Sequence, residues 1–412
     1  MSSESVDLVV VLDAPELGPT RPVGVLSFWP ESRAIAFAYA RSWLGSEDAF
    51  ALEPRLPLVE GRQYIPGSVP PAILRDTSPD LWGTLLLERR AGRHLGPWDL
   101  LTGVADETRM GALRLRRGVE GPFVDDREPA VPPITRLRAL QAGARAFEQD
   151  PARPTADPAI ALLVAPGSSL GGARPKSNFR EADESLWIAK FPSRTDRRDS
   201  AAWEHVYARL ASSAGIEATD ARLLTLGGRG RTFVTRRFDR GPGGRRLYAS
   251  AMTMTEKRDG DPAGYPDIAR AIRLHGAPAF VRVDLEQLFR RLAFNVVAGN
   301  RDDHLRNHGF LRTATGWRLA PAFDMNPTRE QRDHAIAVDG STFAPDLRAA
   351  LATHRIYGLR EDRAVAIVRE VADAVSDWSA VASDTGIAES EQAIVGVAFS
   401  GLASALEITG RR

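Results

Sequence analysis

The sequence predicts an α+β protein with a β-rich N-terminal part and a mainly helical C-terminal part. The first hundred residues hold short apolar runs between turn residues, which is typical of a small antiparallel sheet, at Asp7–Leu12, Val23–Phe28 and Ala34–Ala40. The second half instead repeats apolar residues at helical spacing, as at Leu285, Leu288, Phe289, Leu292 and Val296. The latter pattern predicts a helix that buries one face.

A proline-rich stretch between about Gly118 and Pro166 marks the clearest boundary, and one predicted helix at Thr135–Glu148 interrupts it. We therefore divide the chain into residues 1–150, 151–238 and 239–412. In the first part, Asp76–Gly92 opens with capping residues and ends in arginines, so it predicts a helix. The second part predicts a small α+β lobe, with a helix at Ser200–Ala214 and strands at Leu186–Phe191, Ala221–Leu226 and Thr232–Phe238.

Composition excludes several classes of function. The 412 residues include 54 Lys+Arg and 53 Asp+Glu, a net charge of +1, so no global field draws the protein to nucleic acid or anionic lipid. Cysteine is absent, which excludes disulfides, thiolate metal sites and cysteine nucleophiles. The N-terminus has no basic, apolar signal pattern, and no run approaches 18 uninterrupted apolar residues. We expect a cytoplasmic protein that does not bind membranes.

The stretch from Gly299 to Asn307 is the most informative, because it contains Arg-Asp-x-x-x-x-Asn directly after the amphipathic helix. Phosphoryl transfer needs a carboxylate to deprotonate the acceptor hydroxyl and an amide oxygen to hold a metal, roles that suit Asp302 and Asn307. Asp324 follows a predicted hairpin and would be the second Mg²⁺ ligand. Alone, an Asp-x4-Asn pattern also arises by chance in surface loops.

Upstream residues supply the remaining parts of a phosphotransfer site in order. Lys190 ends an apolar strand and could contact the α- and β-phosphates, while Glu204, on the predicted helix 200–214, could pair with it. Before that strand, a glycine-rich segment from Gly167 to Lys176 could approach a polyphosphate with its backbone N–H groups. Each of these features also has an ordinary structural explanation, as a solvated lysine, a surface glutamate or a flexible loop.

Taken together, these residues resemble the HipA-like serine/threonine kinases of bacterial toxin–antitoxin systems. The resemblance covers nearly the whole chain and is carried by the following segments: Ser78–Gly83, Asp106–Leu113, Ser169–Lys176, Arg237–Arg240, Asp302–Asn307 and Pro321–Asp324. It implies a bilobal protein-kinase-like fold with an extra N-terminal subdomain in residues 1–150, a kinase N-lobe in 151–238 and a helical C-lobe in 239–412. It also implies ATP and Mg²⁺ as cofactors.

The resemblance assigns roles by position. Asp302 would be the catalytic base, Asn307 and Asp324 the metal ligands, and Lys190 a phosphate contact. The resemblance also implies that the nucleotide is bound by a further set of residues, namely Gly167, Ser169, Leu170, Gly171, Gly172, Ala173, Lys176, Glu204, Arg236 and Phe238. Ser169, or its neighbour Ser168, matches a serine that the kinase phosphorylates in itself, and the added charge would repel ATP.

The resemblance further implies partners: a HipB-like helix-turn-helix antitoxin, and a cytosolic protein substrate, with translation factors such as aminoacyl-tRNA synthetases as one target class. DNA would be reached only through the antitoxin, which agrees with the net charge of +1. Two alternatives stay open. The chain could be a small-molecule phosphotransferase, or a nucleotide-binding partner of an antitoxin in transcriptional repression.

Two further patterns have both a functional and a structural interpretation. A run of arginines interspersed with glycines could bind nucleic acid, although such a run more often forms a solvated hairpin. The run comprises Arg229, Arg231, Arg236, Arg237, Arg240, Arg245 and Arg246. His304 and His308 have a spacing that could bind a transition metal. We favour packing and hydrogen bonds for this pair, because no glutamate follows His304.

Overall fold

The structure is a computed structural model that describes residues 4–126, 131–152, 157–164, 174–228, 230–328 and 330–410. The chain forms two compact units. The first unit comprises Met1–Arg194 and Asp239–Ala249, and the second comprises Thr195–Phe238 and Ser250–Arg412. The division of the sequence at 150 and 238 follows the expected subdomains rather than these units, and it stays a prediction.

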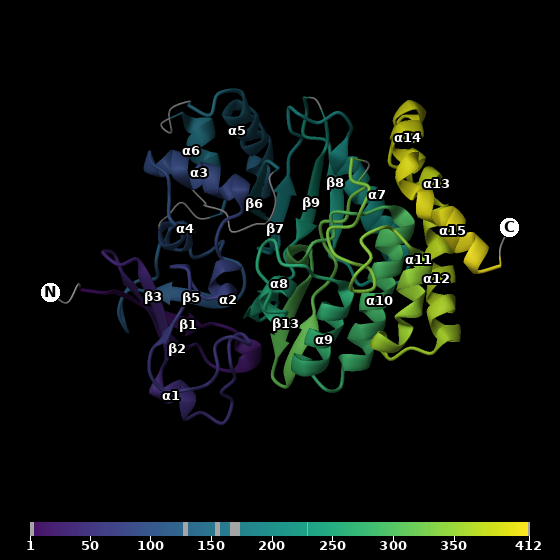
Figure 1. Cartoon of the computed structure of the whole chain (residues 1–412). Coiled ribbons are helices and arrows are strands. Elements are labelled where there is room, and N and C mark those ends of the chain that lie inside the picture. The colour runs from purple at the N-terminus through teal and green to yellow at the C-terminus, as the bar shows by residue number, and fades with distance from the viewer. Residues whose placement is uncertain are drawn as a thin grey trace. The chain divides into compact units, whose positions relative to one another are not determined.

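The first unit begins with the predicted antiparallel sheet, drawn mainly in purple in Figure 1. Its strand order is β4-β3-β2-β1-β5, with bounds Gln63–Tyr64, Ala34–Tyr39, Arg21–Trp29, Val6–Leu12 and Leu113–Arg116. Each neighbouring pair is antiparallel. Val10, Leu26 and Phe37 are fully buried, so one layer of β-branched, leucine and aromatic side chains forms the core beneath this sheet.

The helices of the first unit follow: α1 Arg41–Leu44, α2 Ala72–Arg75, α3 Leu81–Ala91, α4 Pro97–Gly103, α5 Leu137–Gln149 and α6 Pro158–Val164. The predicted helix at 135–148 is confirmed as α5, preceded by a 3-10 turn at Ile134–Arg136. The unit also contains the antiparallel hairpin of β6, Lys176–Arg180, and β7, Leu186–Lys190. The short strands β10, Arg240–Gly241, and β11, Gly244–Arg245, pair with each other.

The predicted start of the helix at Asp76 is wrong by five residues. Asp76 instead ends α2, where its N–H donates to the carbonyl of Ala72. Pro79 disfavours helical geometry for Ser78. The Asp80 carboxylate then accepts the N–H of Gly83 at 2.7 Å and caps α3, which begins at Leu81.

The second unit is mainly helical, as predicted. Its helices are α7 Ser200–Ser213, α8 Ala251–Met254, α9 Tyr265–His275, α10 Val281–Ala298, α11 Leu347–Ala352, α12 Glu361–Ser376, α13 Trp378–Asp384, α14 Glu389–Val395 and α15 Gly401–Ile408. Two antiparallel hairpins accompany them: β8 Ala221–Leu224 with β9 Thr232–Arg236, and β13 Gly309–Thr313 with β14 Gly316–Leu319. The strand β12, Tyr248–Ser250, crosses from the first unit into the second.

Helix α10 is the centre of this unit, and α9 and α12 lie beside it (Figure 1). The predicted apolar face of α10 is buried, and the burial extends to nearly all sides of the helix from Leu288 to Ala298, which the sequence pattern did not predict. The buried positions include polar side chains, such as Arg290 and Asn295, which a hydrophobic pattern counts as the solvent face. The C-terminal end of α10 also accepts a hydrogen bond from the hydroxyl of Tyr207 on α7.

The segment Glu389–Ile408 is long and apolar enough to cross a membrane by composition, and 28% of its most apolar stretch is buried. It is divided into α14, a 3-10 turn at Gly396–Ser400 and α15. Gly401 packs so tightly against α10 that an added Cβ would clash with the carbonyl oxygen of Val296. The 3-10 turn and α15 thus pack against α10, whereas α14 contacts the 3-10 turn and α13 instead.

Candidate active site

The loop after α10 is fixed by the way the helix ends. Gly299 adopts a left-handed conformation with φ of 73°, and a Cβ there would clash with the carbonyl of Ala398. The Gly299 carbonyl accepts the N–H of Thr328 at 3.0 Å, and the Thr328 hydroxyl accepts the N–H of Arg301 at 3.2 Å. The sharp turn therefore directs residues 300–308, the catalytic loop, towards the segment that follows Asp324.

Within this loop, Asp302 and Asn307 are brought together as the spacing predicts. Asp302 is exposed, and Asn307 donates its Nδ2 hydrogen to the backbone carbonyl of Asp302 at 2.7 Å. A 3-10 turn at Leu305–Asn307 closes the loop, with the Asn307 N–H bonded to the carbonyl of His304 at 2.8 Å. Because the amide nitrogen is already bound, the Asn307 Oδ1 is the atom left for a cation.

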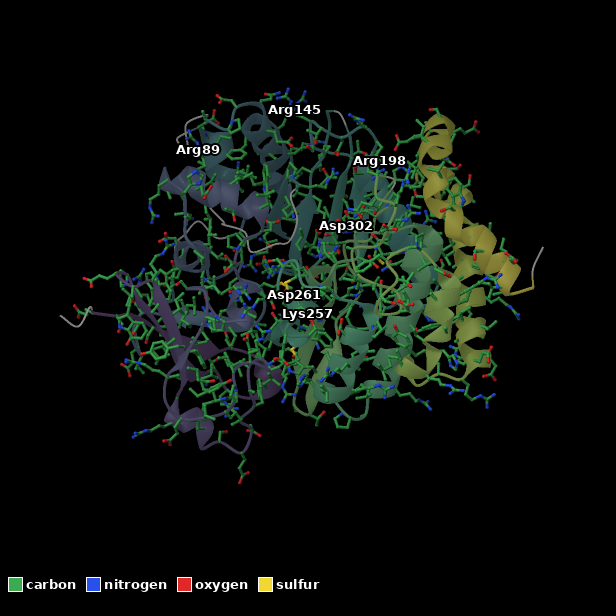
Figure 2. All side chains as sticks on the ribbon, in the orientation of Figure 1. Arg89, Arg145, Arg198, Lys257, Asp261 and Asp302 are labelled. Carbon is green, nitrogen blue, oxygen red and sulfur yellow. The ribbon has the colours of Figure 1, made fainter. Side chains whose placement is uncertain are left out.

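Asp324 contributes a second carboxylate to the same place. Although the residue is exposed overall, partial desolvation of its carboxylate raises the pKa of Asp302, and the neighbouring charges of Asp324 and Asp303 raise it further against the opposing effect of His304. Asp324 itself has φ of 58°, the left-handed region that non-glycine residues rarely adopt. Such strain is concentrated at functional sites. Figure 2 labels Asp302, with Lys257 and Asp261 of the neighbouring loop below it in that view.

These groups fit Mg²⁺ better than a transition metal. Carboxylate and amide oxygens are hard ligands, and Mg²⁺ is usually held by one or two carboxylates together with substrate phosphates. The charge of Asp324 raises the pKa of Asp302, and a cation bound between the two carboxylates would relieve that repulsion. No group of three or more His, Asp or Glu side chains that could hold a metal occurs among the described residues.

Phe238, which is expected to contact the nucleotide, is close to this site. Its ring lies 5.2 Å from the ring of Phe323, the residue before Asp324. Ala322 is held by a hydrogen bond from its N–H to the carbonyl of Glu217 at 2.7 Å, and Ala218 and Ala322 form a parallel bridge. Arg236 is exposed at the end of β9, where its N–H bonds to the carbonyl of Asp220.

The residues expected to bind phosphate lie mostly in the first unit. Lys190 is half-buried at the end of β7, and in the second unit Glu204 is buried on α7, so their pairing stays a prediction. Lys176 does not fit the expected role: its buried ammonium forms an ion pair with Asp80 at 2.7 Å. The expected glycine-rich contacts Gly167, Ser169, Leu170, Gly171, Gly172 and Ala173, together with Ser168, lie outside the described residues.

Among the described residues of the arginine run, five arginines lie within ion-pair distance of carboxylates. Arg240 pairs with Asp239, Arg245 with Asp106, and Arg246 with Glu16 in the first unit. In the second unit Arg231 pairs with Asp199, and Arg236 lies 4.0 Å from Asp220. Arg229 lies outside the described residues. This arrangement favours neither nucleic-acid binding nor a simple solvated hairpin.

The sequence interpretation missed a set of buried polar residues behind the loop. Asp303 accepts hydrogen bonds from the hydroxyl of Tyr265 at 2.7 Å and from Nδ1 of His334 at 3.1 Å. These partners stand 38 and 31 positions away along the chain, so no local spacing could reveal them. His308 is buried beside Tyr265, and burial lowers its pKa to about 4, which agrees with the packing role favoured for it.

Comparisons with known proteins identify one family and several solved structures that resemble this chain. The model of the HipA-like C-terminal domain family matches residues 168–378, about half of the chain. HipA of Shewanella oneidensis, solved in a complex with HipB and operator DNA, has a TM-score of 0.67 and 19% identity, and the match covers 98% of each chain. The proinflammatory kinase CtkA of Helicobacter pylori has a TM-score of 0.36 and 15% identity, over 57% of this chain and 94% of that one.

Comparison with curated proteins gives no significant match. The likeness to HipA extends over the full chain and confirms the expected α+β fold. The family match begins at the second residue of the glycine-rich segment and continues past Asp324, so it contains the catalytic loop described above. On this evidence the chain belongs to the HipA-like family.

Proposed function

We propose that this protein is an ATP- and Mg²⁺-dependent serine/threonine protein kinase that acts as the toxin of a toxin–antitoxin module in the cytoplasm. The observation that carries the proposal is the convergence of Asp302, Asn307 and Asp324 at the end of α10. This donor set combines a base with two oxygen ligands for a metal, which is the minimum that phosphoryl transfer requires.

In the proposed reaction, the Asp302 carboxylate accepts the proton of a serine or threonine hydroxyl. The hydroxyl oxygen forms a bond to the γ-phosphorus as the bond from that phosphorus to the bridging oxygen of ADP breaks. The raised pKa of Asp302 makes its carboxylate a better proton acceptor than an ordinary aspartate. When bound, Mg²⁺ would neutralise phosphate charge, and Asn307 and Asp324 would hold it. Lys190 and the glycine-rich segment would orient the nucleotide.

Incubation of the protein with Mg²⁺ and labelled ATP tests this proposal, followed by mass spectrometry to locate the phosphate. We expect label on Ser169 or Ser168 and none on the Ser169→Ala variant if Ser169 is the acceptor. Asp302→Asn should lower the rate by about 10²- to 10⁴-fold because it removes the base. Asp333→Asn, at an exposed carboxylate in the same unit, is the matched control and should retain the rate.

ATP binding without any labelled product, on the protein itself or on added cytosolic proteins, would overturn the kinase proposal. It would favour a nucleotide-binding partner of an antitoxin. A product that forms only on small hydroxyl compounds would instead favour a small-molecule phosphotransferase.

We also propose a HipB-like antitoxin as partner, with DNA contacted through it. The structural relative from Shewanella was solved with HipB and operator DNA. In this chain, the ion pairs of Arg231, Arg240, Arg245 and Arg246 leave little free positive charge in the arginine run. In a gel-shift experiment we expect operator DNA to be retarded by the antitoxin and retarded further by both proteins. Retardation by this chain alone, at physiological salt, would contradict the expectation.

A further inference from the structure

A continuous chain of side-chain hydrogen bonds lies behind the catalytic loop. Asn300 donates its Nδ2 hydrogen to Oδ1 of Asn295 at 3.0 Å, and Asn295 donates its own Nδ2 hydrogen to the Tyr265 hydroxyl at 2.7 Å. The Tyr265 hydroxyl donates to Oδ2 of Asp303 at 2.7 Å, and His334 Nδ1 approaches the same oxygen at 3.1 Å. We call these five residues the polar relay.

All five members of the polar relay are buried, with at most 3% of any residue exposed. A buried polar group costs free energy unless it is hydrogen-bonded, so such a network is stable only when its partners stay in place. Burial raises the pKa of Tyr265 far above its ordinary value, which keeps its hydroxyl a donor. The relay is therefore a network with one preferred arrangement, unlike an apolar core that can repack.

Two members of the polar relay, Asn300 and Asp303, lie next to the proposed catalytic groups in the chain or through a hydrogen bond. Asp303 directly follows Asp302, and Asn300 accepts, at 3.5 Å, the N–H of Asn326, two residues after Asp324. Asn295, which connects Asn300 to Tyr265, is part of α10 and is therefore held by the helix. A single network thus joins the segment that carries the base to the segment that carries a metal ligand.

His334 ties a third segment to the same carboxylate. Its neighbour Ala335 donates its N–H to the carbonyl of Arg301 at 2.9 Å, and Ala337 bonds to α9 through the N–H of Tyr265 at 3.0 Å. Asp303 Oδ1 is buried without a hydrogen-bond partner among the described residues. An unpaired buried oxygen lowers stability, so an apolar residue would suit this position better if packing alone mattered. The presence of Asp303 there indicates that its other carboxylate oxygen has a role in fixing the geometry of the site.

From these contacts we infer that Tyr265, Asp303 and His334 are positioning residues, which hold the carboxylates of Asp302 and Asp324 at a fixed separation for phosphoryl transfer. The inference rests on the kinase function proposed above. All three are buried, so we assign them no contact with the substrate or the metal. They act through the backbone of the catalytic loop, and a small displacement of reacting groups can cost about 100-fold in rate.

Two measurements on the full chain test this inference. The first is the kinetics of phosphotransfer for Tyr265→Phe, which removes the hydroxyl and keeps the ring. We expect kcat to fall about 10- to 100-fold while KM for ATP stays within about threefold, because nucleotide contacts are unchanged. The second is hydrogen exchange, which should become faster in both peptides 300–309 and 320–328, although Tyr265 lies in neither.

Tyr357→Phe is the matched control, because Tyr357 is equally buried and packs against Phe289 on α10, outside the polar relay. Tyr357→Phe should have the kcat of the wild type and the wild-type rate of hydrogen exchange in peptides 300–309 and 320–328. At His334, asparagine keeps an N–H donor near the position of Nδ1, and leucine does not. His334→Asn should therefore retain most of the kcat that His334→Leu loses, which simple loss of packing would not produce.

The outcomes separate this inference from the proposed function. Wild-type kcat and wild-type exchange in Tyr265→Phe would overturn the positioning role even if the protein is an active kinase. If the wild type transfers no phosphate, the proposed function fails and the kinetic part fails with it. The exchange experiment then still decides whether the polar relay couples the two segments.

Discussion

Asp324 is the residue whose backbone and side chain are most closely linked to the proposed chemistry. Its left-handed φ of 58° turns the chain directly after Phe323, so that the carboxylate and the Phe323 ring are presented from adjacent positions. Asparagine and aspartate tolerate this conformation better than other non-glycine residues, because a short polar side chain can hydrogen-bond locally. The residue type thus serves both the turn and the metal site.

This double role gives a prediction at Asp324. Asp324→Asn should keep the melting temperature within about 2 °C and lose Mg²⁺-dependent ATP binding, because asparagine suits the backbone but lacks the charge. Asp324→Ala should also lose binding and in addition destabilise the protein by about 1 kcal/mol. Thermal unfolding and calorimetric titration check both parts. Equal melting temperatures for the two variants would show that the left-handed backbone is not strained.

Arg109 is fully buried in the first unit, and burial lowers its pKa to about 10. Its guanidinium donates to the Thr77 hydroxyl at 3.1 Å and to the carbonyls of Leu101 and Val104 at 3.0 and 3.1 Å. We expect Arg109→Met to lower the free energy of unfolding by about 3 to 5 kcal/mol, because these buried acceptors lose their donor. Arg138→Met, at an exposed position on α5, should change it by at most about 0.5 kcal/mol. Urea unfolding measures the difference.

At the scale of elements, the end of α10 decides where the catalytic loop goes. Gly299 and Gly92 both end helices in the left-handed conformation, with φ of 73° and 66°. They differ in their surroundings. A Cβ at Gly92 would meet no atom within 4 Å, whereas one at Gly299 would clash with the carbonyl of Ala398. A side chain added at Gly299 should therefore destabilise the protein more than one added at Gly92, although both glycines have the same backbone conformation.

The comparison predicts unequal effects of the same substitution. Gly92→Ala should lower the free energy of unfolding by about 1 kcal/mol, the cost of a left-handed alanine. Gly299→Ala should cost about 3 kcal/mol, since the added methyl group must also displace the chain at Ala398. It should reduce phosphotransfer as well, because the catalytic loop starts at this residue. Chemical denaturation and the labelled-ATP assay check the two effects, and similar losses in both variants would contradict the steric explanation.

Prediction from the sequence succeeded where the signal is local. Strands β1, β2 and β3 of the first sheet and helices α5 and α7 follow from residues close together in the chain, whereas strands β4 and β5 of the same sheet were not predicted. The predicted start of α3 was wrong because the sequence offers two aspartates that could cap the helix, Asp76 and Asp80. The structure uses Asp80, which follows Pro79. The polar relay and the ion pair of Lys176 with Asp80 join residues that are far apart in the chain and that only the fold brings together. The spacing of apolar residues along the sequence carries no information about such pairs.

At the scale of the whole molecule, one buried carboxylate makes stability depend on pH. Glu53 is 4% exposed and accepts the N–H of Ile73 at 2.5 Å, near the start of α2. Burial raises its pKa to about 7, against the opposing hydrogen bonds from the backbone. The folded protein therefore binds this proton more tightly than the unfolded chain does, whose glutamates have a pKa near 4.5.

The stabilisation from protonated Glu53 is fully present below about pH 4.5 and is lost as the pH rises through about 7. We expect the free energy of unfolding to fall by an amount on the order of 3 kcal/mol across this window. Glu53→Gln should remove that part of the pH dependence, and Glu31→Gln, at an exposed position, should retain it. Urea midpoints at pH 5 and pH 8 measure the difference. A wild-type pH slope in Glu53→Gln would assign the dependence to other groups.

The first unit is made of two separate parts of the chain, and this has a consequence for synthesis on the ribosome. Asp239 accepts the N–H of Gly111 at 2.7 Å, and Arg245 donates to the carbonyl of Asp106 at 2.6 Å, so the sheet region is completed by residues made much later. At about 5 to 20 residues per second, the nascent first 194 residues wait several seconds for them. During that interval the new chain exposes unsatisfied polar groups and apolar surface, and a chaperone that shields nascent chains would raise the yield of this protein.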